Sequence, residues 1–493
     1  MRLQAAVVTV VAGLAAGLAA QSAAPAPSSA LAHVVGQALL HSQANQNLEE
    51  LTDTIGERLT GTPNAQRAVE WALARMRAMG LTNVHKEDYT VAHGWQRGIA
   101  DVELLTGARQ KLNAVSMGWT GSTAPGGADG ELLAVNVYDL PQLAGHPGDW
   151  KGKVLLLRAQ GKPPEGFSGL DSFVAMPKFL AAAHAAGALA VIGGQGAGAS
   201  AGMNITHTGV VAFNQYLEEP MVNLTAEDQT LLERDLDHGR AVRLHVDIEN
   251  HVSGPVTASN AVGDVRGREH PDEIVVIGGH LDSWDLATGA TDNGTGAAAA
   301  LSAAQAMVES GQPPRRTVRV VLFTGEEQGL LGSMAYCQQH AAEMPKTVAA
   351  LIMDEGQGPI VGMDTGGHDE ILPALRTLAG YLTAFPAPKL TDESMFETDT
   401  GPFTLAGTAG INLPQDSPNY AYTHHSPVDT FDHVRQDVLV RNAAEMAAMA
   451  YYIADAPQRL TRPFTPAETG AMLKKQGLEK ELRAFGLWNF PEI

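Results

Sequence analysis

The stretch DEIVVIGGHLDSWDLATGATDNGTG, residues 272–296, opens with a continuous apolar run and then places His280, Asp282, Asp285 and Asp292 among glycines. The alanine-rich segment GAAAALSAAQAMVES follows it. A short, continuous apolar run is typical of a strand that is covered on both faces. Aspartate just before an apolar segment is typical of the start of a helix. The stretch therefore predicts a buried strand, a polar loop and a helix.

Two further apolar runs end in the same way. TVRVVLFTG leads directly to Glu326 and Glu327, and VAALIM leads to Asp354 and Glu355. In open α/β sheets ligands bind outside the carboxyl ends of the strands. We therefore predict an α/β domain in which these carboxylates converge on His280.

Bulk composition limits the class of protein. The chain has 493 residues, which predicts two or three domains, and its 44% hydrophobic content is typical of a folded protein. Its formal charge of -21, from 54 acidic and 33 basic residues, argues against nucleic acid or anionic membrane as a partner, because these partners favour basic patches.

The composition changes between residues 121 and 250. This segment contains DWKGKVLLLRAQ, which indicates a turn and a strand, and FLAAAHAAGALAVIGG, which indicates a helix leading into a buried strand. It carries no cluster of histidines and carboxylates. We interpret 121–250 as an inserted domain, with 25–120 and 251–493 forming the other domain.

The N-terminus resembles an export signal. Arg2 precedes an apolar stretch over 5–20 and the small residues of QSAAPAPSSA. We predict a secretory signal peptide over 1–24 and a periplasmic or secreted protein, the alternative being an uncleaved anchor helix. Cys337 is the only cysteine, which excludes an intramolecular disulfide, and we interpret it as a helix residue rather than a nucleophile.

His280 and Asp282 form the first candidate pair. Alternate side chains of an extended segment share a face, so Asp282 can accept the second ring N–H of His280 and orient the imidazole. Glu326 and Glu327 are adjacent at a strand end and point in different directions. One can therefore bind a metal while the other faces a substrate.

The charges of these groups suit a pair of divalent cations. Two cations bring a charge of +4, which three carboxylates (Asp292, Glu327 and Asp354) and one bridging hydroxide would neutralise. A mixture of imidazole and carboxylate favours zinc, with cobalt or manganese as alternatives. The segment YTHHSPVDT, residues 422–430, adds two adjacent histidines.

Together these motifs resemble the co-catalytic di-zinc aminopeptidase and carboxypeptidase family, most closely its plasma glutamate carboxypeptidase branch. GERLTGTPNAQRAVEWALARM, near the start of the chain, belongs to the resemblance. It implies a three-layer α/β/α domain with a mixed sheet, an inserted, mostly β protease-associated domain, and a homodimer. It also implies an exopeptidase that hydrolyses dipeptides or short peptides, with the carboxypeptidase or dipeptidase type favoured and an aminopeptidase as the alternative.

The resemblance also implies a role for each candidate residue. The chain would hold two Zn²⁺. His280 and Asp354 would bind one ion, Glu327 and His425 would bind the other, and Asp292 would bridge the two. Glu326 would be the general base that acts with the bridging hydroxide, and Asp282 would assist catalysis through His280. His425, and not His424, matches the family pattern of His, Ser or Thr, two residues and Asp-Thr. Asp399 in TDTGPF would support the site, and Tyr420 and Tyr422 are the candidates for the oxyanion donor.

Two rival interpretations have weaker support. Residues 198–202 match the G-x-S-x-G motif of serine hydrolases, and Gly196 with Gly198 matches half of a dinucleotide fingerprint, but the following MNITHTGVVAF has no helical period. A catalytically silent binding protein on the same fold would have lost metal ligands, whereas this chain retains all five candidates and the base.

Overall fold

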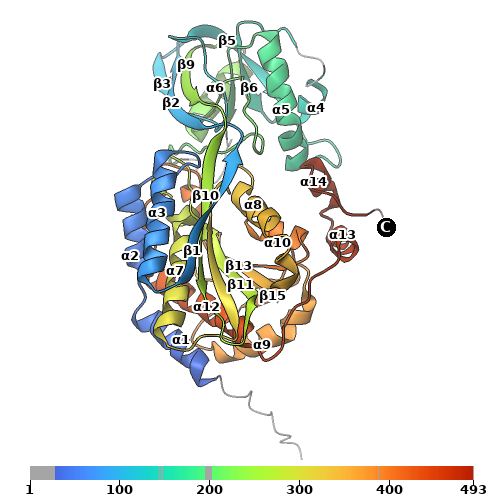
Figure 1. Ribbon diagram of the computed structural model, residues 1–493. Helices are drawn as coiled ribbons and strands as arrows, with labels where there is room; N and C mark the ends of the chain where they lie inside the picture. The colour runs from blue at the N-terminus through green and yellow to red at the C-terminus, as the bar shows by residue number, and fades with distance from the viewer. Residues whose placement is uncertain (1–27, 144, 146–147, 195–201, 387, 492–493) are drawn as a thin grey trace, which may run out of the picture.

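The computed structural model describes residues 28–491, apart from 144, 146–147, 195–201 and 387. The predicted signal peptide over 1–24 lies outside the described residues, as do residues 198–201 of the serine motif. No helix in the described part of the chain has both the length and the apolar character needed to cross a bilayer. Figure 1 shows two units, each built around its own sheet.

The first unit contains an eight-stranded mixed sheet in the order β1-β10-β12-β11-β13-β16-β14-β15. Its strands are β1 (Thr82–Val91), β10 (Val256–Val265), β11 (His270–His280), β12 (Arg316–Phe323), β13 (Thr347–Ile352), β14 (Gly362–Asp364), β15 (Lys389–Thr391) and β16 (Ala409–Asn412). Strands β12, β11, β13 and β16 are parallel neighbours, whereas β10 is antiparallel to both β1 and β12. The three predicted apolar runs are the central strands β11, β12 and β13.

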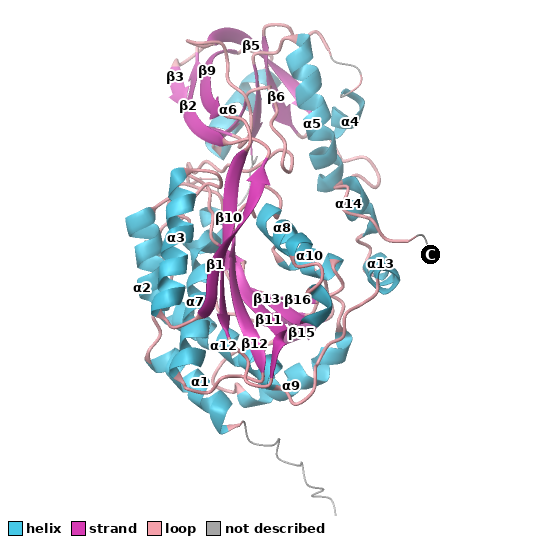
Figure 2. Cartoon of the chain, viewed as in Figure 1, coloured by secondary structure: helices cyan, strands magenta, loops and turns pink. Residues whose placement is uncertain are grey.

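Helices cover both faces of this sheet, as Figure 2 shows. They are α1 (Ser29–Leu40), α2 (Ala44–Glu49), α3 (Pro63–Ala78), α7 (Thr295–Glu309), α9 (Leu372–Tyr381) and α12 (Gln436–Asp455) on one side, with α8 (Leu331–Gln339) and α10 (Thr400–Leu405) on the other. Val275 and Ile277 of β11 pack in the core with α7 and α12, whereas Ile274 and Val276 pack with α8 and α10. Burying each of these side chains contributes about 1.5–3 kcal/mol to the free energy of folding. The predicted three-layer α/β/α architecture with a mixed sheet is confirmed.

The second unit is an eight-stranded sheet in the order β3-β2-β9-β5-β6-β7-β8-β4. Its strands are β2 (Trp95–Leu104), β3 (Gln110–Leu112), β4 (Ala114–Ser116), β5 (Ala128–Asn136), β6 (Lys153–Arg158), β7 (Ala190–Gly194), β8 (Met221–Leu224) and β9 (Arg243–Val252). Helices α5 (Gly169–Ala186) and α6 (Ala226–Asp237) pack on its opposite faces, and α4 (Leu140–Leu143) lies beside α5. Strands β2, β3 and β4 precede residue 121, so we propose 95–252 as the inserted segment in place of 121–250.

The two units meet beside the end of β11. Trp95 and Trp119 of the second unit stack with ring centroids 5.6 Å apart, and Trp119 meets Trp284 of the first unit edge-on at 6.2 Å. Arg97 of β2 also reaches across and forms a salt bridge with Asp285, with Nη2 2.7 Å from Oδ1. Asp285, in the segment 272–296, therefore joins the two units.

The C-terminal segment connects the units a second time. It contains α13 (Pro466–Lys475) and α14 (Glu479–Ala484). Figure 1 shows α14 beside the end of α5, and Lys480 Nζ of α14 lies 3.0 Å from Asp171 Oδ1 of α5. The C-terminal segment therefore adds to the contacts of Arg97 and Trp119 that hold the second unit against the first.

Candidate metal centre

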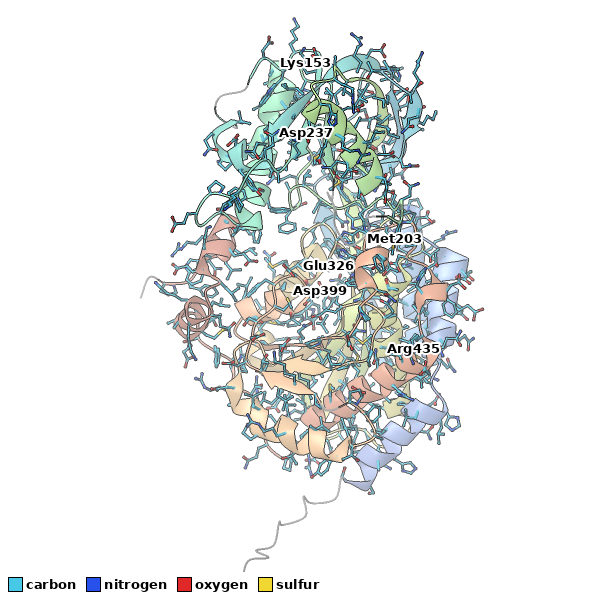
Figure 3. All side chains as sticks on the ribbon, turned by 180° about the vertical axis from the view of Figure 1, so that it is seen from behind. Lys153, Met203, Asp237, Glu326, Asp399 and Arg435 are labelled. Atoms are coloured by element: carbon cyan, nitrogen blue, oxygen red, sulfur yellow. The ribbon has the colours of Figure 1, made fainter. Side chains whose placement is uncertain are left out.

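The predicted site residues lie at the carboxyl ends of three neighbouring strands. His280 is the last residue of β11 and is paired in register with Phe323, the last residue of β12. Asp354 follows β13 by two positions, and Glu326 follows β12 by three. Figure 3 shows Glu326 and Asp399 close together at the end of the first unit that faces the second. The topology thus brings residues from distant parts of the chain to one point.

Asp292 lies between two histidines. Its Oδ1 is 3.0 Å from His280 Nε2, and its Oδ2 is 3.3 Å from His425 Nε2. Each histidine also meets a second carboxylate: His280 Nε2 is 3.3 Å from Asp354 Oδ1, and His425 Nε2 is 2.9 Å from Glu327 Oε2. The five predicted ligands therefore form two imidazole–carboxylate pairs that share one aspartate.

The second nitrogen of His280 lies near both the backbone and the carboxylate of Asp282. His280 Nδ1 lies 3.0 Å from the backbone carbonyl of Asp282 and 3.5 Å from its carboxylate. An N–H at Nδ1 therefore donates to the backbone and leaves Nε2 as the nitrogen that faces the carboxylates. The other oxygen of the Asp282 carboxylate, Oδ2, accepts a hydrogen bond from Thr60 Oγ1 at 2.8 Å, and Thr60 Oγ1 accepts one from the Gly325 N–H at 2.8 Å. Asp282 thus connects β11 to the turn before Glu326.

The two adjacent glutamates have different surroundings. Glu327 is 6% exposed and pairs with His425, whereas Glu326 Oε2 is 4.0 Å from His280 Nε2; both glutamates line the large cavity described below. Burial, with the charge of Asp292, raises the pKa of Glu327 to about 7. Burial also raises the pKa of Glu326 well above its usual range, with Asp354 and Glu327 contributing in the same direction. Carboxyl groups whose pKa is raised in this way are typical of sites that transfer protons or bind cations.

The two adjacent histidines also differ. His424 stacks on His425 with ring centroids 3.6 Å apart, and its Nε2 is 3.8 Å from Asp292 Oδ2. The side chain of His424 is 46% exposed, and that of His425 is 21% exposed. Geometry alone lets either histidine approach Asp292, but only His425 also pairs with Glu327 among the described contacts.

Arg58 organises the loop that carries the site and was not predicted from the sequence. Its guanidinium is fully buried and donates to the backbone carbonyls of Leu281 at 2.6 Å, Thr288 at 2.6 Å and Gly289 at 2.8 Å. Burial lowers the pKa of Arg58 to about 10. The contacts join segments more than 220 positions apart in sequence; a local pattern gives no signal for them.

Asp429, in the segment YTHHSPVDT, has a function that the sequence did not indicate. Its carboxylate accepts the backbone N–H of Thr291 at 2.6 Å and of Asp292 at 3.2 Å. Burial raises the pKa of Asp429 to about 7. The loop that supplies His425 therefore also holds Asp292 in place.

The remaining predicted residues occupy three different settings. Asp399 is fully buried near Glu326, and burial raises its pKa to about 7. Tyr420 lines the same cavity as Glu326, whereas Tyr422 is not among the described residues of that lining. Cys337 is half-buried on α8, and burial raises the pKa of its thiol.

A cavity of about 770 Å³ adjoins the site. Its lining includes Asp292, Glu326, Asp354 and His425 from the first unit, together with Phe173 and other side chains of the second. Cavities of this size hold small-molecule or short-peptide ligands. The arrangement combines two sets of side chains that can bind metal ions, an extra carboxylate and a cavity for a substrate, which suit hydrolysis assisted by metal ions.

Comparison with known proteins agrees with this geometry. Residues 260–450 match the model of peptidase family M28. Carboxypeptidase Q from Mus musculus is 28% identical over 433 residues, covering 87% of this chain and 90% of its own length. The crystal structure of a peptidase M28 precursor from Shewanella amazonensis SB2B is 29% identical with a TM-score of 0.78, covering 88% of this chain and 98% of its own.

A zinc aminopeptidase from Bacillus subtilis shares the fold at 21% identity, with a TM-score of 0.65 over 86% of this chain and 97% of its own. The matched family segment contains every candidate ligand from His280 to His425 as well as Glu326. The family match over residues 260–450, the relatives that span most of the chain and the shared architecture show that this protein is similar to peptidase family M28.

Proposed function

We propose that the protein is a zinc-dependent exopeptidase that hydrolyses dipeptides or short peptides. The observation that carries this proposal is the position of Asp292 between His280 and His425, each of which has a second carboxylate partner. We assign two zinc ions per chain. One would be held by His280 and Asp354 and the other by Glu327 and His425, with Asp292 between them.

The described residues fit such ions. Three carboxylates of the site are at most 8% exposed, and buried charges need a paired charge or a metal. Among the described residues, none gives Glu327 Oε1 a hydrogen bond. Imidazole and carboxylate donors suit zinc, and the Bacillus subtilis relative of the same fold is a zinc aminopeptidase. When bound, two zinc ions would supply the Lewis acidity that activates water and polarises a peptide carbonyl.

Glu326 would carry the proton. It lines the cavity and is not one of the five paired ligands, so its carboxylate is available to take a proton from the attacking water and pass it to the leaving amine. Asp282 would act by connecting the strand end at His280 to the turn at Gly325. Tyr420, in the same cavity lining, remains the candidate donor for the developing oxyanion.

One observation favours the aminopeptidase alternative over the carboxypeptidase type. Among the described residues that line the cavity there is no lysine or arginine to pair with a substrate carboxylate, whereas Glu355, Glu397 and Glu481 add negative charge. A free amine is a cation and is attracted to such a lining, and a terminal carboxylate is repelled by it.

A substrate panel tests both parts of the proposal. Free dipeptides, N-acetylated dipeptides and peptide amides would be incubated with the protein and followed by mass spectrometry. We expect hydrolysis that stops with a chelator and returns with zinc, and that is lost on N-acetylation but kept on amidation. Hydrolysis that survives complete removal of metal would refute the zinc assignment, and loss on amidation alone would restore the carboxypeptidase type.

Three further proposals follow from the resemblance. The second unit would be a protease-associated domain, the protein would be exported to the periplasm or the exterior, and it would form a homodimer. Light scattering of the protein at micromolar concentration tests the dimer, and a monomeric mass would exclude it.

A further inference from the structure

One wall of the large cavity is aromatic. Phe173, Phe213 and Phe485 all line it together with the site residues. Their ring centroids are 5.1 Å apart for Phe173 and Phe213, 5.2 Å for Phe213 and Phe485, and 5.8 Å for Phe173 and Phe485. We refer to these three side chains as the phenylalanine wall. Aromatic pairs at such distances are each worth about 0.5–1.5 kcal/mol beyond the area they bury.

The wall is assembled from three distant segments. Phe173 lies on α5, Phe213 lies in the loop before β8, and Phe485 follows α14 at the C-terminus. The salt bridge between Lys480 and Asp171 fixes α14 against α5 next to these rings. Figure 1 shows α14 beside the end of α5, on the side of the molecule away from the strands β1 and β10 that connect the two units. The C-terminal segment thereby contributes to the lining of the cavity beside the candidate centre.

The phenylalanine wall leaves apolar surface exposed in the cavity. Phe213 is 41% exposed despite its two aromatic neighbours. Leu170, Met395, Phe396 and Leu487 add further apolar surface to the same cavity lining. Covering apolar area is favourable by about 25 cal/mol per Å²; the lining therefore favours an apolar occupant.

We propose that the phenylalanine wall is a specificity subsite that receives a large apolar side chain of a short peptide, so that the C-terminal segment takes part in substrate selection. The inference rests on the proposed peptidase function, because the wall and Glu326 line one cavity. A residue that flanks the scissile bond at Glu326 would place its side chain in that cavity. A polar side chain there would lose its hydration without gaining a hydrogen bond from the wall.

Substitution of Phe485 tests the subsite with turnover as the readout. Unblocked dipeptides that differ at one residue (Phe, Leu, Ala or Gly) would be compared in the full-length protein and in Phe485→Ala. We expect kcat/KM for the Phe and Leu substrates to fall roughly 10- to 200-fold, the range for an altered apolar pocket, with the Ala and Gly substrates changed by less than about threefold. Phe213→Ala should have the same effect from the other unit.

Trp488→Ala is the matched control. Trp488 belongs to the same C-terminal segment but packs on Phe490, with ring centroids 5.2 Å apart, and does not line the cavity. It should leave the ratio between large and small substrates unchanged. An equal loss on all four substrates in Phe485→Ala, or the same change of ratio in Trp488→Ala, would refute the subsite.

A binding measurement separates this inference from the peptidase proposal. Calorimetry with free L-phenylalanine and L-alanine needs no turnover. We expect L-phenylalanine to bind more tightly to the wild-type protein and to Trp488→Ala, and the difference to disappear in Phe485→Ala. If no peptide is hydrolysed but this difference is found, the subsite stands and the proposed function fails. If peptides are hydrolysed without preference for large side chains and L-phenylalanine binds no better than L-alanine, the subsite is refuted while the proposed peptidase function stands.

Discussion

Glu326 and Glu327 are neighbours in the chain but contact different histidines: Glu327 Oε2 lies 2.9 Å from His425 Nε2, whereas Glu326 Oε2 lies 4.0 Å from His280 Nε2. The difference arises because they follow the end of β12 at successive positions, where adjacent side chains point in different directions. Two residues of one chemical type can therefore serve two functions.

The first prediction separates these functions. Glu326→Gln keeps the shape of the side chain but cannot accept a proton, so zinc content should stay at the wild-type level while turnover falls roughly 10²- to 10⁴-fold. Glu327→Gln removes a charged ligand, so both zinc content and turnover should fall. Metal analysis and steady-state kinetics on the two variants measure this. A Glu326→Gln protein that has lost its zinc would reverse the assignment.

The second prediction concerns His424 and His425. His425→Ala removes an imidazole that lies 3.3 Å from Asp292 and 2.9 Å from Glu327, so zinc content should drop by about one equivalent. His424→Ala removes only the neighbour stacked on it and should leave the zinc content unchanged. Atomic absorption on both proteins decides between them, and zinc loss in His424→Ala alone would show that the ligand was chosen wrongly.

The third prediction concerns the salt bridge between the two units. Arg97 and Asp285 are only 11% and 15% exposed, and removing one partner leaves the other charge unpaired in a largely buried position. Arg97→Gln should therefore destabilise the protein by about 3 kcal/mol and lower its melting temperature. Lys153→Gln is the control, because it removes an exposed pair with Glu131 that is worth less than about 1 kcal/mol. Equal melting temperatures for the two variants would contradict this reading of the interface.

The fourth prediction is a pH dependence of stability. Glu445 on α12 is 3% exposed, and burial raises its pKa from 4.5 to about 8. Between these values the folded protein keeps a proton that the unfolded chain releases, so the contribution of Glu445 to stability decreases as the pH rises from about 4.5 to about 8. Glu445→Gln does not titrate. Its melting temperature relative to the wild-type protein should therefore increase from pH 5 to pH 8.

The control for this pH dependence is Glu70→Gln, which changes an exposed glutamate on α3. Its melting temperature should follow that of the wild-type protein at both pH values. Calorimetric scans at pH 5 and pH 8 provide the comparison. A Glu445→Gln protein whose relative stability is the same at both values would show that the carboxyl group is not the source of the effect.

The central strands could be predicted from the sequence because their signal is local. The apolar runs before His280, Glu326 and Asp354 are β11, β12 and β13, and parallel strands place their carboxyl ends at the same edge of a sheet. The N-terminal limit of the second unit could not be predicted in this way. Trp95 of β2 pairs with Val252 of β9, and pairing over such a separation leaves no local pattern.

The hydrogen-bond partners of the site residues also could not be predicted from local sequence patterns. The spacing of His280 and Asp282 predicts a carboxylate contact, which lies at 3.5 Å, but it does not predict the closer backbone carbonyl of Asp282 at 3.0 Å. The buried guanidinium of Arg58 binds carbonyls that are brought to it only by the fold. Sequence indicates which side chains carry chemistry, whereas their orientation depends on contacts between distant segments.

The pairing of Val91 with Val256 has a topological consequence. These residues end β1 and begin β10, so the whole second unit is inserted, in effect, at the tip of one β-hairpin of the first unit. A short turn joining these two positions would leave every strand connection of the first sheet intact. The shortened protein would keep Asp292, Glu326 and His425, but it would lose Phe173 and Phe213 from the cavity. The topology thus separates the residues proposed for bond cleavage from two of those proposed for side-chain selection.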